Sequence, residues 1–404
     1  MTNENINVTT DNTQGNDLSA EMRTYYEKRL IDIAGPKLVH DRFGDFYPVP
    51  KNGGKTVQFR KYSPLPKASK PLTEGVTPDG RALNVTAVTC DLEQYGDWIG
   101  LSDMLDLTAI DNNVVQATRL LGNQAGRTLD SVTREVLAGG TNVRYAPNGT
   151  TEVTSRADIT ADCKITPEII FRAAADLQAM NADPVDDSYV AIIHPYAAFD
   201  LMRNSEWIDV NKYANADNIY AGEIGKLGGV RFVSTPEAKV IGPATVADGI
   251  SRLTVKTAVN SSTTSVAVNE TLSAATFDEP IPVYVNGQPN TITAITVAGG
   301  TSSVTLGTAI SSLAKGALIC GAGAGKDGSA VFCTLVLGAH AYGTTEIEGG
   351  GLRHIVKQLG YGDDPLDQRA SCGWKATKAA KRLVEAYMVR IESGSAYSDM
   401  AESN

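Results

Sequence analysis

Residues that could do chemistry are few in this sequence, and their spacing matches no catalytic motif. The glycine run at residues 320–327 has the glycine content of a phosphate-binding loop. However, Cys320 stands where that loop requires its first glycine, and Asp327 stands where it requires Ser or Thr after the lysine. The run also ends a strand-rich segment and does not open a helix. We expect a flexible linker at this position.

The other candidate ligands and nucleophiles are equally scattered. The four histidines, His40, His194, His340 and His354, fall in no metal-ligand spacing, and no Gly-x-Ser-x-Gly nucleophile motif occurs. The acidic segment 362–367 could bind a divalent cation, but its spacing fits no EF-hand and its Asp-Pro step is typical of a turn. The sequence predicts no catalytic residue, no metal site and no cofactor.

Composition narrows the class of protein further. The chain has 404 residues, 42% of them hydrophobic, and a formal net charge of −10, which argues against a protein whose main task is gripping nucleic acid. No apolar stretch approaches the ~18 residues needed to cross a membrane, and the N-terminus lacks the basic start and apolar segment of a signal peptide. The five cysteines form no Cys-x-x-Cys pair, so we expect reduced thiols in a cytosol.

The elements that would position any site begin with an unusual hairpin. Residues 51–95 contain two alternating arms, 56–60 and 83–88, separated by a segment rich in proline and glycine. From residue 51 to residue 81 there are seven Lys or Arg and two acids, a local charge of +5 in an acidic protein. A long loop with the opposite charge to its protein favours a contact arm over a solvated loop. The predicted contact residues are Arg60, Lys61, Lys67, Lys70 and Arg81.

A long amphipathic helix is predicted directly after this hairpin, over residues 101–140. Ser102 or Asp103 can cap its start and two glycines end it. At ~1.5 Å per residue such a helix spans roughly 50 Å. Its apolar stripe recurs at three- or four-residue steps, at Leu107, Ile110, Val114, Leu121, Ala125, Leu129, Val132 and Val136.

The remaining chain alternates helices and strands without regular βαβ spacing, so the predicted fold class is α+β. Helices are expected at residues 20–33, 166–180 and 196–202, with a tight turn at 225–229. Strands are expected at residues 189–193, 230–233, 330–337, 352–358 and 382–391.

Composition changes between residues 244 and 326. These 83 residues hold 22 Ser or Thr and only eight charged residues, and Asn286-Gly287 and Gly299-Gly300 supply hairpin turns. We interpret the segment as an inserted all-β module. The predicted division is an N-terminal arm at 1–50, an extended hairpin loop at 51–95, a long helix with an α+β domain at 96–243, the module at 244–326, and a return to the main domain with the C-terminus at 327–404.

The order of these parts resembles tailed-bacteriophage major capsid proteins of the Hong Kong 97-type fold, in a podophage-like branch. The resemblance covers roughly residues 20–243 and 329–400 and includes the stretches 225–233 (GKLGGVRFV), 373–376 (GWKA) and 383–392 (LVEAYMVRIE). It implies that the chain is no enzyme and self-assembles into an icosahedral head of hexamers and pentamers. Such a head encloses double-stranded DNA without specific binding.

The resemblance also implies partners and a location. The hairpin would lie over a neighbouring subunit, and a separate scaffolding protein, a portal and a cement or decoration protein would be partners, with no membrane involved. The protein would be found in the virion after assembly in the host cytoplasm. Lys67 and Lys70 lie in the hairpin, but no acceptor Asn or catalytic acid is identifiable, so we expect no isopeptide crosslinking.

Three alternatives remain open from the sequence. The β-rich module also suits a surface or adhesion protein with a β-sandwich module, although no secretion signal supports that class. A non-viral nanocompartment shell would share the fold but would lack packaged DNA. An enzyme with a site assembled from scattered residues is the third.

Overall fold

The computed structural model describes residues 6–7, 39–62, 65, 67, 69, 71, 74, 80–104, 113–207, 223–348, 350–357 and 368–404. The chain forms two compact units. Unit 1 comprises Met1–Val136 and Tyr342–Val384, and unit 2 comprises Leu137–Ala341 and Glu385–Asn404.

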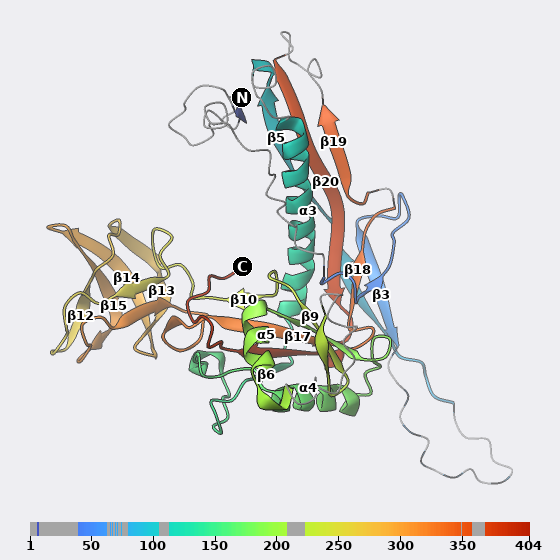
Figure 1. Cartoon of the computed structure of the whole chain (residues 1–404), viewed down its shortest axis with the longest axis horizontal. Coiled ribbons are helices and arrows are strands. Elements are labelled where there is room, and N and C mark those ends of the chain that lie inside the picture. Colours follow the sequence, from blue (N-terminus) through green and yellow to red (C-terminus); the bar gives the residue numbers. More distant parts are fainter. Residues whose placement is uncertain are drawn as a thin grey trace. The chain divides into compact units, whose positions relative to one another are not determined.

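Unit 1 is built on a long antiparallel strand pair and one helix. Strand β5 (Glu93–Ser102) pairs with β20 (Arg369–Arg382), and the helix α3 (Asn113–Ala138) runs alongside both (Figure 1). The helix packs its apolar stripe on one face of the sheet, where its buried members Leu121 and Ala125 meet side chains of alternate β20 residues, namely Cys372, Trp374 and Ala376.

Short strands complete this sheet. Its order is β1-β5-β20-β18-β2, and β19 (Arg353–Lys357) also pairs with β20. The strands β1 (Ile6–Asn7) and β2 (Asp45–Phe46) each join in parallel, β1 to β5 and β2 to β18 (Tyr342–Thr345).

Unit 2 contains a seven-stranded sheet in the order β6-β21-β17-β7-β9-β8, with β10 paired to β17. Its central strands are buried along their whole length, which explains why β7 and β17 are almost entirely apolar. The bounds are β6 (Val143–Tyr145), β7 (Tyr189–Ile193), β8 (Glu223–Leu227), β9 (Val230–Ser234), β10 (Val240–Ile241), β17 (Val331–Leu337) and β21 (Met388–Ser393).

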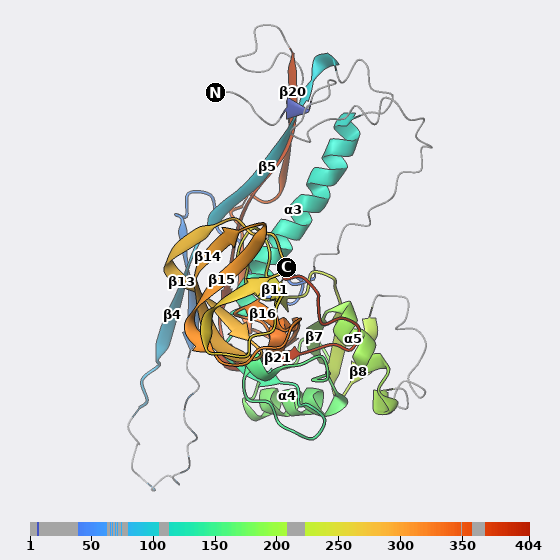
Figure 2. The same cartoon turned by 90° about the vertical axis from the view of Figure 1, so that its left-hand side faces the viewer.

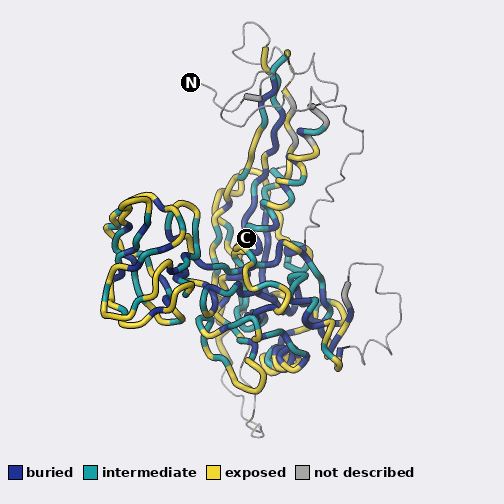
Figure 3. The backbone as a smooth tube through the Cα atoms, turned by 60° about the vertical axis from the view of Figure 1, so that its left-hand side comes forward, coloured by how far each residue is buried: buried dark blue, intermediate teal, exposed yellow. Residues whose placement is uncertain are grey.

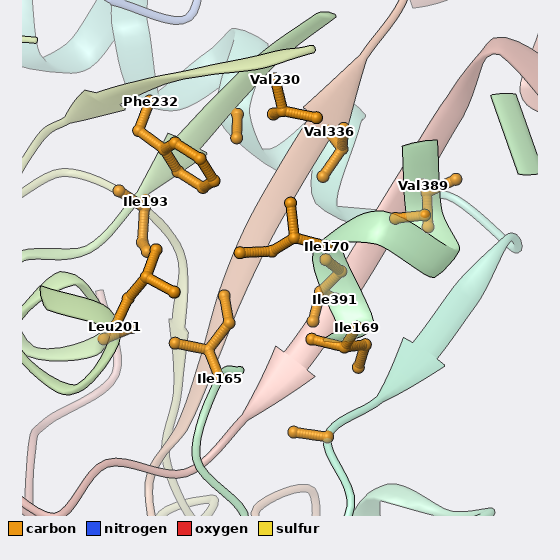
Figure 4. Close-up of a cluster of buried hydrophobic side chains, with 14 of the residues drawn as sticks. Ile165, Ile169, Ile170, Ile193, Leu201, Val230, Phe232, Val336, Val389 and Ile391 are labelled. Carbon is orange, nitrogen blue, oxygen red and sulfur yellow. The ribbon is translucent and has the colours of Figure 1, made fainter. Parts of the chain in front are cut away.

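Two helices cover this sheet. Both α4 (Pro167–Ala179) and α5 (Pro195–Met202) begin at a proline, whose fixed φ suits the first helical turn. Figure 4 shows Ile169 and Ile170 of α4 packed with strand residues such as Val336 in one apolar cluster.

The segment predicted to be strand-rich forms a separate sheet within unit 2, in the order β11-β16-β13-β14-β15-β12. Along the first half of β15 every second residue is buried, and the strands curve around one another (Figures 2 and 3). The bounds are β11 (Arg252–Thr254), β12 (Thr263–Val268), β13 (Ala275–Val285), β14 (Gln288–Ala298), β15 (Thr301–Ile310) and β16 (Leu318–Gly321).

This sheet closes on itself. The backbone amide of Lys256 donates to the carbonyl oxygen of Ala267 (2.8 Å), and the amide of Asn269 donates to the carbonyl oxygen of Thr254 (2.9 Å), which joins the first strand to β12. Closure leaves few unpaired backbone groups at the sheet edges, so the module forms a small barrel around its own apolar core.

Several predictions were wrong in detail. Leu101 and Ser102 are the last residues of β5 and not the start of the helix, although the helix does end before Gly139. The strand predicted at 382–391 is interrupted, because β20 ends at Arg382, a 3-10 turn follows at Glu385–Tyr387 and β21 then begins in the other unit.

Two glycine segments also differ from their predictions. Gly225 lies in β8, so the turn into β9 is confined to Gly228 and Gly229. The run at 320–327 is no flexible linker: a Cβ on Gly321 would lie 1.9 Å from the carbonyl oxygen of Ala244. That glycine permits a close backbone contact where the chain leaves the barrel. The predicted helix at 20–33 lies outside the described residues.

Candidate intersubunit contact surface

The predicted extended loop forms the two-stranded hairpin of β3 (Thr56–Tyr62) and β4 (Val85–Asp91), paired in register from Thr56 opposite Asp91 to Tyr62 opposite Val85. The alternation seen in the sequence arises because the two faces of this hairpin have different neighbours. One face of the hairpin packs on the rest of unit 1 and the other face is exposed.

The packed face anchors the base of the hairpin. Phe59 is 7% exposed, and its ring meets the Tyr47 ring edge-to-face at 5.4 Å between centroids. Val57 and Cys90 pack against a small cluster that includes Ala379 of β20. The sequence predicted the hairpin, but it gave no signal that Phe59 would anchor it.

The predicted contact residues lie on or beyond this base. Arg60 is on the exposed face of β3, and Lys61 is half-buried on the packed face. Lys67 and Arg81 are exposed, and Lys70 lies outside the described residues. Among the described residues they form a distributed basic arm and not a single cluster.

Apolar side chains accompany these charges. Leu65, Leu83 and Val85 are 58%, 65% and 49% exposed. A two-stranded ribbon is marginally stable alone in water, and exposed apolar side chains on it are typical of a surface that a partner covers.

A buried polar network in unit 1 holds the segment that precedes the hairpin. Asp130 of α3 accepts hydrogen bonds from the backbone amides of Val39 (3.1 Å) and His40 (2.8 Å) and from Nδ1 of the His40 ring (2.7 Å). Burial acts to raise the pKa of Asp130, but these hydrogen bonds outweigh it and hold the pKa below its ordinary value. The network therefore fixes residues 39 and 40 to the helix.

Two further side chains extend this network. Nζ of Lys378 on β20 binds Asp41 and also donates to the carbonyl oxygen of Leu129 at 2.8 Å. The Tyr342 hydroxyl donates to the carbonyl oxygen of His40, and burial raises the pKa of this phenol. The helix, β18, β20 and the preceding segment are thereby joined at one polar centre.

The histidines and acidic residues that were considered as ligands form no catalytic or metal site among the described residues. His194 caps α5 by accepting from the Tyr196 amide at its Nδ1 (3.2 Å), and burial lowers the pKa of His194 to about 4. No three His, Cys, Asp or Glu residues within the described part of the chain come together as a metal site. The acidic segment 362–367 and the His354 side chain lie outside the described residues.

One groove of about 320 Å³ lies between β6, the loop that follows it and α4. Its charges are already paired, since Arg172 binds Glu152 (3.0 Å) and Glu168 (2.8 Å). The described residues that line it include no histidine or cysteine. Within the described residues, no helix combines the length and apolarity that a membrane crossing requires.

Comparisons with known proteins bear on this arrangement. The fold is similar to the capsid of the cyanophage P-SCSP1u (TM-score 0.56, 12% identity, 92% of this chain and 93% of that chain covered). It is also similar to the capsid of Ralstonia phage GP4 (TM-score 0.56, 13% identity, 98% and 100% covered) and to that of cyanophage Pam1 (TM-score 0.50, 12% identity, 93% and 94% covered). No curated protein matches the chain.

A protein-family model described as phage capsid protein matches residues 86–271. The chain is similar to phage capsid proteins over this segment, which is just under half of its length. Its α+β fold is of the Hong Kong 97 type. The match begins in β4 and continues through β5, α3 and the unit 2 sheet into the barrel. The family match and the similarity to phage capsid structures together support a major capsid protein of a tailed phage, which assembles with copies of itself into the shell of the virion.

Proposed function

We propose that the hairpin is the principal contact between copies of this capsid protein, and that copies joined through it form hexamers and pentamers around packaged double-stranded DNA. The observation that carries this proposal is the contrast along one hairpin. Its base is packed through Phe59, while Arg60, Lys67 and Arg81 beyond the base are exposed.

The physical argument is that a ribbon fixed at one end binds at a lower entropic cost than a free loop. The prolines of residues 64–78 restrict the backbone further, so less conformational freedom is lost on docking. Its exposed apolar side chains supply area to bury, and its cations favour an acidic surface on the next copy.

The same proposal assigns a role to each of the other segments of the chain. Residues 96–243 and 327–404 supply the peripheral and axial body of the subunit, and the barrel at 244–326 projects from it. Residues 1–50 form an N-terminal arm. The chain catalyses no reaction, assembles in the host cytoplasm, and has scaffolding, portal and cement proteins as further partners.

The proposal is tested by reversing the charges of the arm. The triple variant Arg60→Glu, Lys67→Glu and Arg81→Glu should fold with unchanged stability, because all three side chains are exposed, yet fail to form particles in sedimentation and electron microscopy. Lys315→Glu, an exposed lysine of the barrel, is the matched control and should assemble normally. Normal particles from the triple variant would contradict the proposal.

A further inference from the structure

The sheet of unit 1 has a second face, opposite α3, that is only partly covered. Every second residue of each strand points to this face. Gly373 of β20 pairs with Trp98 of β5 on one side and with Ile355 of β19 on the other, so all three residues belong to it. The hairpin base covers the end near Ala379. At the other end Trp98 is 52% exposed and Ile355 is 43% exposed.

We call this uncovered end the open face. It has three positions on each of three strands, and none of the nine is acidic. They are Gly96, Trp98 and Gly100 of β5, Ser371, Gly373 and Lys375 of β20, and Arg353, Ile355 and Lys357 of β19.

Two of its cations are arranged unfavourably for an isolated subunit. Arg353 lies directly opposite Lys375 in the β19–β20 ladder, and both are exposed. Neither side chain forms an ion pair or hydrogen bond with any residue that the structure describes. Like charges directly opposite each other destabilise a sheet, so this pair is best explained by a ligand that neutralises it.

Between the exposed side chains of Trp98 and Ile355 the sheet has no side chain, because Gly373 lies between them. A Cβ on Gly373 would come within 2.9 Å of the Trp98 Cβ and 3.0 Å of the Asp97 carbonyl oxygen. A larger residue here would displace Trp98, whereas glycine leaves a flat strip of backbone beside it. Another chain can approach such a strip closely.

We propose that the open face is a docking surface for a second copy of this chain, which presents an acidic surface to it. This inference rests on the proposed function, because it requires that copies assemble. The half-exposed Trp98 and Ile355 favour a protein partner over nucleic acid, since exposed tryptophan and apolar side chains gain most from a packed protein interface.

The positive charge of the open face determines which surface of the second copy can bind to it. The whole chain carries −10, whereas the open face holds three cations and no acid, so the excess of acidic side chains lies elsewhere on the chain and can complement these cations. The hairpin segment 51–81 carries +5 and is therefore disfavoured here. Two open faces cannot meet each other for the same reason, so the contact is heterologous and can propagate around a closed shell.

Charge reversal at Lys375 tests this inference with two opposed readouts. In the isolated subunit Lys375→Glu should leave the melting temperature unchanged or raise it, because the new carboxylate lies opposite Arg353. Particle formation should weaken roughly tenfold in critical concentration, because the second copy then meets a negative charge. Lys315→Glu in the barrel is the control for adding a negative charge elsewhere and should change neither quantity.

A critical concentration that stays within about twofold of wild type contradicts the inference. Loss of thermal stability together with loss of assembly also contradicts it, because Lys375 then has a structural role only.

Photocrosslinking identifies the occupant of the open face. Benzoylphenylalanine in place of Trp98, irradiated in assembled particles, should give a capsid–capsid adduct whose second peptide is acidic and lies outside the hairpin. Crosslinks to nucleic acid, to an accessory protein, to hairpin residues 60–87 or to nothing overturn the inference while the proposed function stands. Wild-type protein that forms no particle contradicts both.

Discussion

Asp130→Asn is the substitution whose effect follows most directly from the contacts in unit 1. Asp130 is 2% exposed, and its carboxylate accepts three hydrogen bonds, two at Oδ1 from backbone amides and one at Oδ2 from the His40 ring. Asparagine keeps the shape and the Oδ1 acceptor, but it places an NH₂ group against Nδ1 of His40. The ring must then carry its proton on Nε2, which is buried without a partner among the described residues.

The cost can be worked from these contacts. Loss of charge assistance on three hydrogen bonds costs roughly 0.5 kcal/mol each, and a buried unpaired N–H costs ~1–3 kcal/mol. The free energy of unfolding should therefore fall by about 3 kcal/mol, equivalent to a decrease of roughly 6–12 °C in melting temperature for a unit of this size. Chemical denaturation of the unassembled subunit measures the change.

The pH dependence supplies a second readout. Because the folded-state pKa of Asp130 lies below its ordinary value, its contribution is present above about pH 4 and is lost as the pH falls through the lower folded value. The gap between wild type and Asp130→Asn should narrow in that window. Glu135→Gln is the control, since Glu135 is half exposed in its ion pair with Arg134 and should change stability by less than ~0.5 kcal/mol. A loss below ~1 kcal/mol for Asp130→Asn would refute the reasoning.

Three further predictions concern other parts of the chain. Phe59→Ala should cost ~2–3 kcal/mol at the hairpin base, seen as faster hydrogen exchange in β3 and β4 and as lost particles; unchanged exchange would contradict the anchor role. Gly321→Ala should destabilise the barrel by more than ~2 kcal/mol, because its Cβ would meet the Ala244 carbonyl oxygen at 1.9 Å. Gly122→Ala, in an open position on α3, should instead stabilise by ~0.5–1 kcal/mol in the same thermal scan. The pKa of His194 is lowered to about 4 by burial, so its part of the stability is complete above about pH 6.5 and declines by up to ~2 kcal/mol as the pH falls towards 4. His194→Asn, which can still cap the helix, should flatten this slope, and an unchanged slope would show that another group titrates.

Local pattern was enough to predict the elements whose periodicity is strong. The apolar stripe through Leu121 and Ala125 predicted α3, and the alternation around Phe59 predicted the β3–β4 hairpin. Both patterns arise from a single buried face, which is a property of the element itself. The proline at the start of α4 and of α5 is equally local, because its fixed φ suits the first helical turn.

The errors arise where tertiary pairing overrides local preference. Strand β20 reads RASCGWKATKAAKR, whose alanines and lysines favour a helix, yet it is the central strand of unit 1 because β5 and β19 pair with both of its edges. The predicted helix 101–140 includes Leu101, whereas the backbone of Leu101 pairs with Ala370 in the β5–β20 ladder.

The candidate surface was predictable in charge but not in geometry. The basic residues of the hairpin are evident in the sequence, because their excess does not depend on the fold. The anchoring of Phe59 beside Tyr47 and the Arg353–Lys375 opposition depend on pairing between segments far apart in sequence. No local pattern encodes such a register.

The central claim is that the hairpin beyond its Phe59 base contacts another copy of the chain. A reconstruction of the assembled particle by electron cryomicroscopy tests it directly, through the surroundings of Arg60 and Arg81. The account predicts that both guanidinium groups lie against carboxylates of a neighbouring copy and that Leu83 and Val85 are covered by that copy. Side chains that face solvent, or that touch only their own chain in every subunit of the shell, would contradict it.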